Sequence, residues 1–148
     1  MTRDAQQSKL YRFEQTFVFP SDKNPVSRDG AQALINYVWQ ELGYLYPPTV
    51  ECLSKNAKTV LARGSRHVII LPETTTSSII LHELAHSLTS LPDHLKYNDS
   101  IASHGPEYVG AYAMLLDRFL GIPLLMTFSR LQEAGIDFKV FGKAVFED

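Results

Sequence analysis

The sequence has little of several features by which whole classes of protein are identified. It contains one cysteine, Cys52, so no disulfide can form within the chain. Its formal net charge is −2 and its lysines and arginines are scattered, so it has no basic footprint for nucleic acid. It has no internal repeat, no low-complexity tract and no run of about eighteen apolar residues. A disulfide-stabilised scaffold, a repeat protein and a helical membrane protein are therefore disfavoured.

The N-terminal segment also lacks an element, because residues 1–9 have no apolar core of a secretory signal peptide. We therefore expect a cytoplasmic protein without membrane association, and we expect the polar residues 1–8 to be disordered. The chain has 148 residues and is 45% hydrophobic, which suffices for one core and is too short for two ordinary domains. We predict a single domain over residues 1–148.

Apolar periodicity and turn residues predict a mixture of strands and helices. Alternation with aromatic side chains on one side predicts a half-buried strand over residues 10–19. A helix capped by Ser27 or Asp29 is predicted to end at Gly43. Further strands are predicted over residues 49–53, 59–63 and 67–71, and further helices over about 75–89, 106–120 and 126–134, with a loop at 91–103 and a short strand after 136.

One of these helices carries His82-Glu83-Leu84-Ala85-His86 within an apolar run. Residues four apart lie on the same face of an α-helix, so the two imidazoles can bind one ion. Glu83 then lies beside that face, where a carboxylate can act as a general base for a water that the metal activates. Two buried histidines and a glutamate without partners would be costly. The motif therefore predicts a zinc site with Glu83 as its base.

A catalytic zinc normally has three protein ligands and keeps one position open. His104, Glu107 and His94 are the candidates for the third ligand, giving either a three-histidine or a two-histidine, one-glutamate site. The metzincin pattern fails, because its glycine and last histidine positions hold Thr89 and Pro92.

The helix motif and the later segment His104-Gly105-Pro106-Glu107-Tyr108 together resemble the active-site signature of SprT-like zinc metalloproteases. They are also similar to small metallohydrolases predicted in actinobacteria and their phages. The resemblance covers about residues 66–120. It implies a compact α+β, zincin-like fold, in which a small, mainly antiparallel sheet packs with helices and the motif lies on the central active-site helix. It implies one zinc ion per chain, held by His82, His86 and His104.

The resemblance further implies that residues 67–71 form a sheet edge that pairs with an extended peptide. We therefore expect a metallopeptidase acting on a peptide or protein substrate, with His67, Tyr108 and Tyr112 as candidate substrate-binding residues. Two alternatives remain open. One is a non-proteolytic zinc amidase or other hydrolase, and the other is a non-catalytic binding protein stabilised by a metal.

Overall fold

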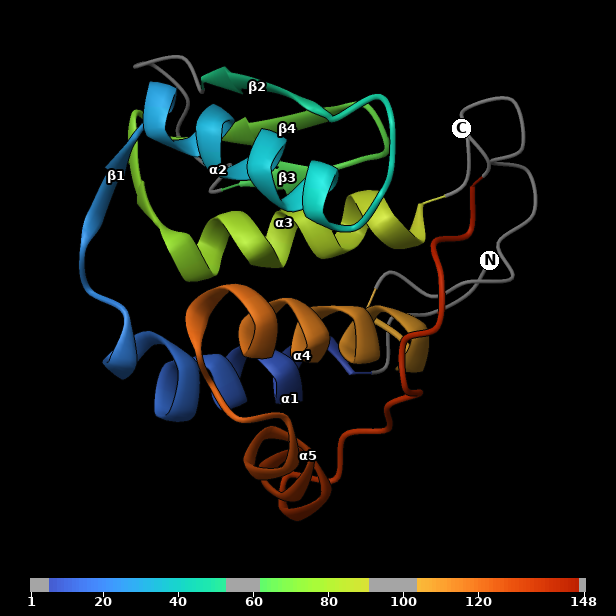
Figure 1. The fold of residues 1–148 in the computed structure, drawn as a ribbon. Coiled ribbons are helices and arrows are strands. Elements are labelled where there is room, and N and C mark those ends of the chain that lie inside the picture. The colour runs from blue at the N-terminus through green and yellow to red at the C-terminus, as the bar shows by residue number, and fades with distance from the viewer. Residues whose placement is uncertain (1–5, 53–61, 91–103, 147–148) are drawn as a thin grey trace.

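The computed structural model describes residues 6–52, 62–90 and 104–146, which form an α+β protein (Figure 1). Its helical elements are α1 (Gln7–Phe13), the π-helical η1 (Glu14–Val18), the 3-10 turn η2 (Phe19–Ser21), α2 (Arg28–Glu41), α3 (Ser77–Thr89), α4 (Pro106–Leu120) and α5 (Leu124–Glu133). Its strands are β1 (Pro25–Ser27), β2 (Thr49–Cys52), β3 (Arg63–Gly64), β4 (Val68–Leu71) and β5 (Thr74–Thr76).

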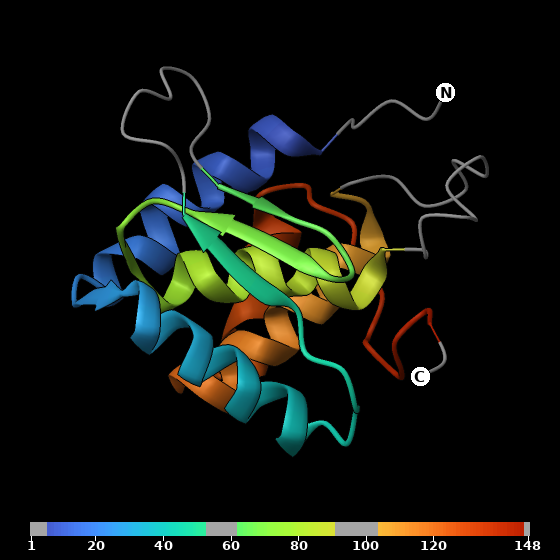
Figure 2. The same ribbon diagram turned by 90° about the horizontal axis from the view of Figure 1, so that it is seen from above.

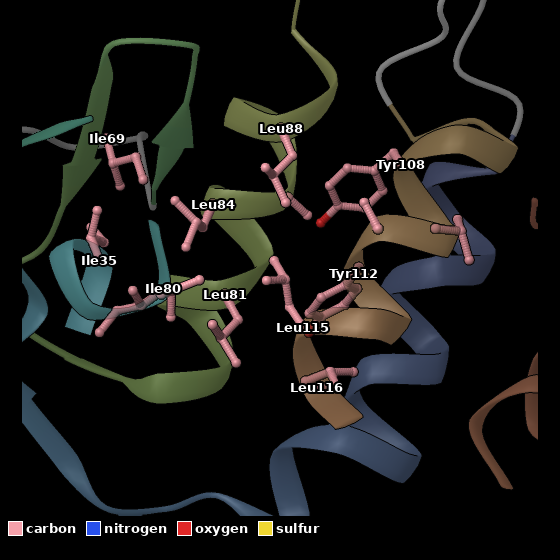
Figure 3. Packing of buried hydrophobic residues seen from close by; sticks show 14 of the residues in the cluster. Ile35, Ile69, Ile80, Leu81, Leu84, Leu88, Tyr108, Tyr112, Leu115 and Leu116 are labelled. Carbon is pink, nitrogen blue, oxygen red and sulfur yellow. The ribbon is translucent and has the colours of Figure 1, made fainter. Parts of the chain in front are cut away.

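Helix α3 lies at the centre of the molecule, with the sheet and α2 on one side and α4 and α1 on the other (Figure 1). Ile80 and Leu84 point toward the sheet and α2, whereas Leu88 points toward α4 (Figure 3). All three side chains are fully buried. Because burying one such side chain contributes about 1.5–3 kcal/mol, this core fixes α3 firmly between the two layers.

The starts of the two helices that flank the sheet are set by hydroxyl caps. Ser27 Oγ accepts a hydrogen bond from the Gly30 amide at the start of α2, and Thr76 Oγ1 accepts one from the Ile79 amide at the start of α3. Such caps contribute about 0.5–2 kcal/mol each. Gly43 follows α2 with a φ of 83°, in the left-handed region that glycine tolerates best. The predicted bounds of these two helices are thereby confirmed.

The helices α4 and α5 also confirm the predicted pattern. Pro106 lies in the first turn of α4, where its missing amide costs no hydrogen bond, and Gly121 ends the helix with a φ of 73°. Helix α5 begins at Leu124, two residues before the predicted start, because Pro123 already provides the turn that precedes it.

The prediction of a strand over residues 10–19 is wrong, because this segment is helical. Its buried residues are Leu10, Phe13, Glu14 and Val18, whose spacing is that of one face of a helix. In the predicted strand Tyr11 would face the core with Phe13, but Tyr11 is 41% exposed. The aromatic residues favour a strand by intrinsic propensity, and burial against the rest of the molecule overrides that preference.

Two of the three strand pairs among the described residues are antiparallel, as expected, and the third is parallel, so the three-stranded sheet is mixed. Its strand order is β2-β4-β3, with β2 parallel to β4 and β3 antiparallel to β4, while β1 and β5 form a separate antiparallel pair (Figure 2). Strand β4 therefore has neighbours on both sides, so residues 67–71 are not the free edge that we expected to bind a peptide. The edge beside α3 is β3, where Gly64 lies against the backbone of Glu83.

The last described segment passes back along α4 and forms no strand within residues 136–146, contrary to expectation. The Lys139 amide donates to the Pro106 carbonyl at 2.9 Å, and Gly110 leaves room for the Lys139 backbone. At the other end, residues 6–8 are ordered at the start of α1, so the disorder predicted for residues 1–8 is wrong there. Residues 1–5, the predicted strand at 59–61 and the predicted loop at 91–103 lie outside the described residues. None of the described helices has the length and apolar character needed to cross a membrane.

Candidate metal centre

Three histidines from two helical segments converge at the junction of α3 and α4. His82 and His86 lie one turn apart on α3, and His104 precedes α4. One ring nitrogen of each lies within 4.8 Å of the others. Among the described residues, Glu107 does not join this group and stands instead in the first turn of α4, where the helix dipole favours a carboxylate. The other candidate third ligand, His94, lies outside the described residues.

The three imidazoles fit a zinc ion in number and type. Tetrahedral ligands at about 2.0–2.1 Å from zinc lie about 3.3 Å from one another, within the 4.8 Å bound that the nitrogens satisfy. The ligating form of histidine is the neutral ring. Burial, together with the neighbouring His82 and His104, lowers the pKa of His86 well below 6.5, so this ring is neutral at physiological pH.

His82 contacts Glu14, which lies 68 residues earlier in the chain. Its Nδ1 is 2.7 Å from Glu14 Oε2, and both side chains are buried. Burial lowers the pKa of His82, but the hydrogen bond and charge of Glu14 and the charge of Glu83 outweigh it, so that the pKa is raised above 6.5. Because Glu14 occupies Nδ1, the ring nitrogen left for a metal is Nε2.

Glu83 lies near the other ring nitrogen of His82. Its Oε2 is 3.9 Å from His82 Nε2, and its side chain is buried. Burial raises the pKa of Glu83 to about 7. The charge of Glu14 raises this pKa further, whereas the charge of His82 lowers it. A carboxyl group with a pKa near neutrality can both accept and return a proton. The geometry therefore provides three candidate ligands and an adjacent group suited to general base chemistry.

Tyr108 and Tyr112 are fully buried and hydrogen-bonded to the protein, which does not suit the direct substrate contact that we expected of them. The Tyr108 hydroxyl donates to the His82 carbonyl at 2.9 Å, and its ring stacks on His86 at a centroid distance of 4.3 Å. The Tyr112 hydroxyl donates to Glu14 Oε2 at 2.7 Å. Both tyrosines thus hold groups around the site in place, and their rings lie between α3 and α4 among the buried side chains (Figure 3).

His67 is not brought into the histidine cluster. It is exposed just before β4, and its carbonyl accepts a hydrogen bond from the Thr49 amide at 2.9 Å. The expectation that His67 contacts substrate depended on residues 67–71 being the edge strand, and β4 is instead the central strand of the sheet.

A cavity of about 250 Å³ opens beside His82 and Glu83. Its outer wall includes Gln15, Phe19 and Ile79, and the same three residues line a second, more open cavity of about 520 Å³. The two cavities therefore adjoin each other at the start of α3, and we refer to them together as the groove beside the candidate base.

The N-terminal helical segment contributes site residues that the sequence analysis missed. Besides Glu14, they include Tyr11, whose ring centroid lies 5.6 Å from that of His104, and Gln6, whose Nε2 donates to the His104 carbonyl at 3.1 Å. The available signal was a charged residue, Glu14, on the buried stripe of a helix. The sequence analysis did not use this signal, because it predicted a strand for the segment.

Comparison of the chain with protein-family models, with curated proteins and with solved structures finds no match. The chemistry of its own residues is therefore the basis for a functional assignment.

Proposed function

We propose that this protein is a zinc-dependent hydrolase that cleaves peptide bonds. The observation that carries the proposal is the convergence of three imidazoles, with the Glu83 carboxylate 3.9 Å from the nitrogen that His82 leaves for a metal. A structural zinc site is closed by four protein ligands, whereas a catalytic site has three and an adjacent proton acceptor. Three imidazoles with an adjacent carboxylate among the described residues match the second arrangement, which supports a catalytic site.

His82, His86 and His104 would hold the ion as neutral imidazoles. When bound, zinc supplies a Lewis acid that polarises a carbonyl group and lowers the pKa of water to about 7. Glu83 accepts a proton from the attacking water and returns it to the leaving amine. In the metal-free protein burial raises the pKa of Glu83 to about 7, and a carboxyl group near neutrality can both accept a proton and release it.

Two features support a peptide as the substrate. Among the described strands, β3 is the edge of the sheet beside Glu83, and an extended chain can bind to such an edge through backbone hydrogen bonds. The groove past Phe19 and Ile79 begins at the same carboxylate and can accept an apolar side chain next to the cleaved bond. The resemblance of the two histidine motifs to SprT-like metalloproteases points in the same direction, and the zincin-like architecture is part of this proposal.

The test measures metal content and hydrolysis on the same protein preparations. Elemental analysis of the untagged wild type should find about one zinc per chain, and a library of peptides with varied side chains should contain cleaved members. His104→Ala should lose the zinc, whereas Glu107→Ala, a nearby substitution outside the cluster, should retain it. Glu83→Gln should retain zinc while the rate of cleavage falls by about 10²–10⁴-fold, the usual contribution of a general base.

The outcomes separate the possible functions. Cleavage of small amides without cleavage of any peptide would identify a non-proteolytic hydrolase. Bound zinc with no hydrolysis of any kind would identify a metal-stabilised binding protein. Full hydrolytic activity in Glu83→Gln, or a wild type that stays free of metal after zinc is supplied, would refute the proposal.

A further inference from the structure

We propose that Glu14 is a positioning residue of the metal centre, which orients His82 toward the ion and balances part of the ion's charge. This inference rests on the proposed metal site, and it assigns a role to the N-terminal helical segment. Glu14 would not itself bind the ion, because its carboxylate contacts Nδ1 of His82, and Nε2 is the nitrogen left for a metal.

The first argument concerns the ring nitrogen that carries the proton. A carboxylate can only accept, so the contact of 2.7 Å between Glu14 Oε2 and His82 Nδ1 requires the proton to be on Nδ1. The lone pair of the neutral ring is then on Nε2, the nitrogen that faces Glu83. A carboxylate behind a metal-binding histidine fixes both the tautomer and the orientation of the ring, and it makes the ligand more basic.

The second argument is that Glu14 is itself held rigidly. The Tyr112 hydroxyl donates to the same oxygen, Oε2, at 2.7 Å, and only 2% of the residue is exposed. Tyr108 holds the backbone of His82 through a hydrogen bond to its carbonyl. Helix α4 thus supports both members of the Glu14–His82 pair, one through each tyrosine.

The local backbone is also adapted to this position. Glu14 begins the π-helical segment η1, and its carbonyl accepts from the Phe19 amide five residues later. A π-helical turn inserts an extra residue and changes where the side chains after it point, and such turns are frequent at functional sites. Here Glu14 faces His82, while Phe19 faces the groove.

The third argument is electrostatic. A buried carboxylate is costly without a compensating positive charge. Two carboxylates, Glu14 and Glu83, lie beside His82, and three imidazoles that bind a metal as neutral rings contribute no positive charge. A divalent cation among the imidazoles would balance the two negative charges. Glu14 should therefore increase the affinity of the site for a divalent metal beyond what the three ligands provide.

The experiment measures the zinc affinity of the full chain by competition with a chelating dye. Glu14→Gln keeps the size of the side chain and removes its charge. We expect it to weaken zinc binding by about 10–100-fold, the usual effect of losing such a partner. Glu41→Gln makes the same change at an exposed position at the end of α2 and should leave the affinity unchanged. Tyr112→Phe should weaken binding less than Glu14→Gln, because the carboxylate remains.

A spectroscopic measurement separates positioning from a purely structural role. Cobalt(II) bound in place of zinc has an absorption spectrum that depends on ligand geometry. We expect this spectrum to change in Glu14→Gln and to stay the same in Glu41→Gln. If Glu14→Gln does not fold, Glu14→Asp provides the same test, because it keeps the charge and withdraws the carboxylate from Nδ1.

Zinc affinity within twofold of the wild type, together with an unchanged cobalt spectrum, would overturn the role assigned to Glu14 and leave the metal site intact. A wild type that binds no zinc would instead refute the proposed function itself, so the two failures are distinguishable.

Discussion

The contact between Gly64 and Glu83 gives a prediction that can be tested without a known substrate. A methyl group at position 64 would meet the Glu83 carbonyl oxygen, and it would lie 2.9 Å from the carbonyl carbon and 3.1 Å from Cα. Carbon atoms in contact are about 3.5–4.0 Å apart, so Gly64→Ala must move β3 or α3 by at least about 0.6 Å. Neither backbone can move freely, because α3 is packed on both sides.

The expected loss of stability follows from that displacement. Overpacking of this kind costs about 1–3 kcal/mol. For a chain of this size, each kcal/mol corresponds to about 2–4 °C, so Gly64→Ala should lower the melting temperature by about 2–12 °C. The matched control is Gly142→Ala, where an added methyl group meets nothing within 4 Å. Its stability should stay within about 0.5 kcal/mol of the wild type.

The same substitution should impair the proposed chemistry more than it impairs metal binding, because the residue displaced is the base itself. A misplacement of about 1 Å can cost about 10²-fold in rate. We expect zinc content to be retained while hydrolysis falls by about tenfold or more. Thermal unfolding of the two variants is the primary assay. A Gly64→Ala protein that melts within 1 °C of Gly142→Ala would show that the contact is not as tight as described.

Further predictions concern the buried polar groups and the groove. Burial raises the pKa of Tyr108 and Tyr112 well above 10, so both should stay protonated while the protein is folded. Because the pKa is higher in the folded than in the unfolded protein, the stability that they contribute is complete below pH 10 and is lost at higher pH. An ultraviolet titration should therefore show two tyrosines that ionise only on unfolding, and their ionisation in the folded protein would contradict this. Asp22→Ala removes the carboxylate that accepts from the Ser78 amide at 2.6 Å, and should cost about 0.5–2 kcal/mol in urea unfolding. Ile79→Phe should narrow the cavity beside Glu83 and reduce cleavage of peptides with a bulky apolar residue by about tenfold or more, while glycine-containing peptides are spared.

Much of the helical structure could be predicted because its signals are local. Ser27 and Thr76 cap helices, Pro106 begins one and Gly43 ends one, and each acts through its own backbone geometry within a few residues. The spacing of His82 and His86 is equally local. The sequence therefore predicted where α3 lies in the chain and that His82 and His86 are on the same face of it.

The parts that could not be predicted depend on contacts between distant segments. The parallel pairing of β2 with β4 depends on how the chain crosses between them, which no residue in either strand encodes. The segment that carries Glu14 alternates as a strand does, and it becomes helical because its face of period 3.6 can be buried in this fold. Neither the pattern of the N-terminal segment nor that of α3 predicts, by itself, the contact between Glu14 and His82.

Because the site is built from three separate segments, it can form only after all three have been synthesised. During synthesis Glu14 emerges first, the two histidines of α3 follow, and His104 comes last, with 68 residues separating Glu14 from His82 and 98 separating it from Tyr112. Contacts over such separations form late, because loop closure must precede them. A nascent chain that has exposed α3 but not α4 has two of the three proposed ligands, and it lacks Tyr112, which holds Glu14. Metal capture at the proposed site should therefore begin only after α4 has left the ribosome and packed against α3, so that a bound ion would mark a chain in which these distant segments have already come together.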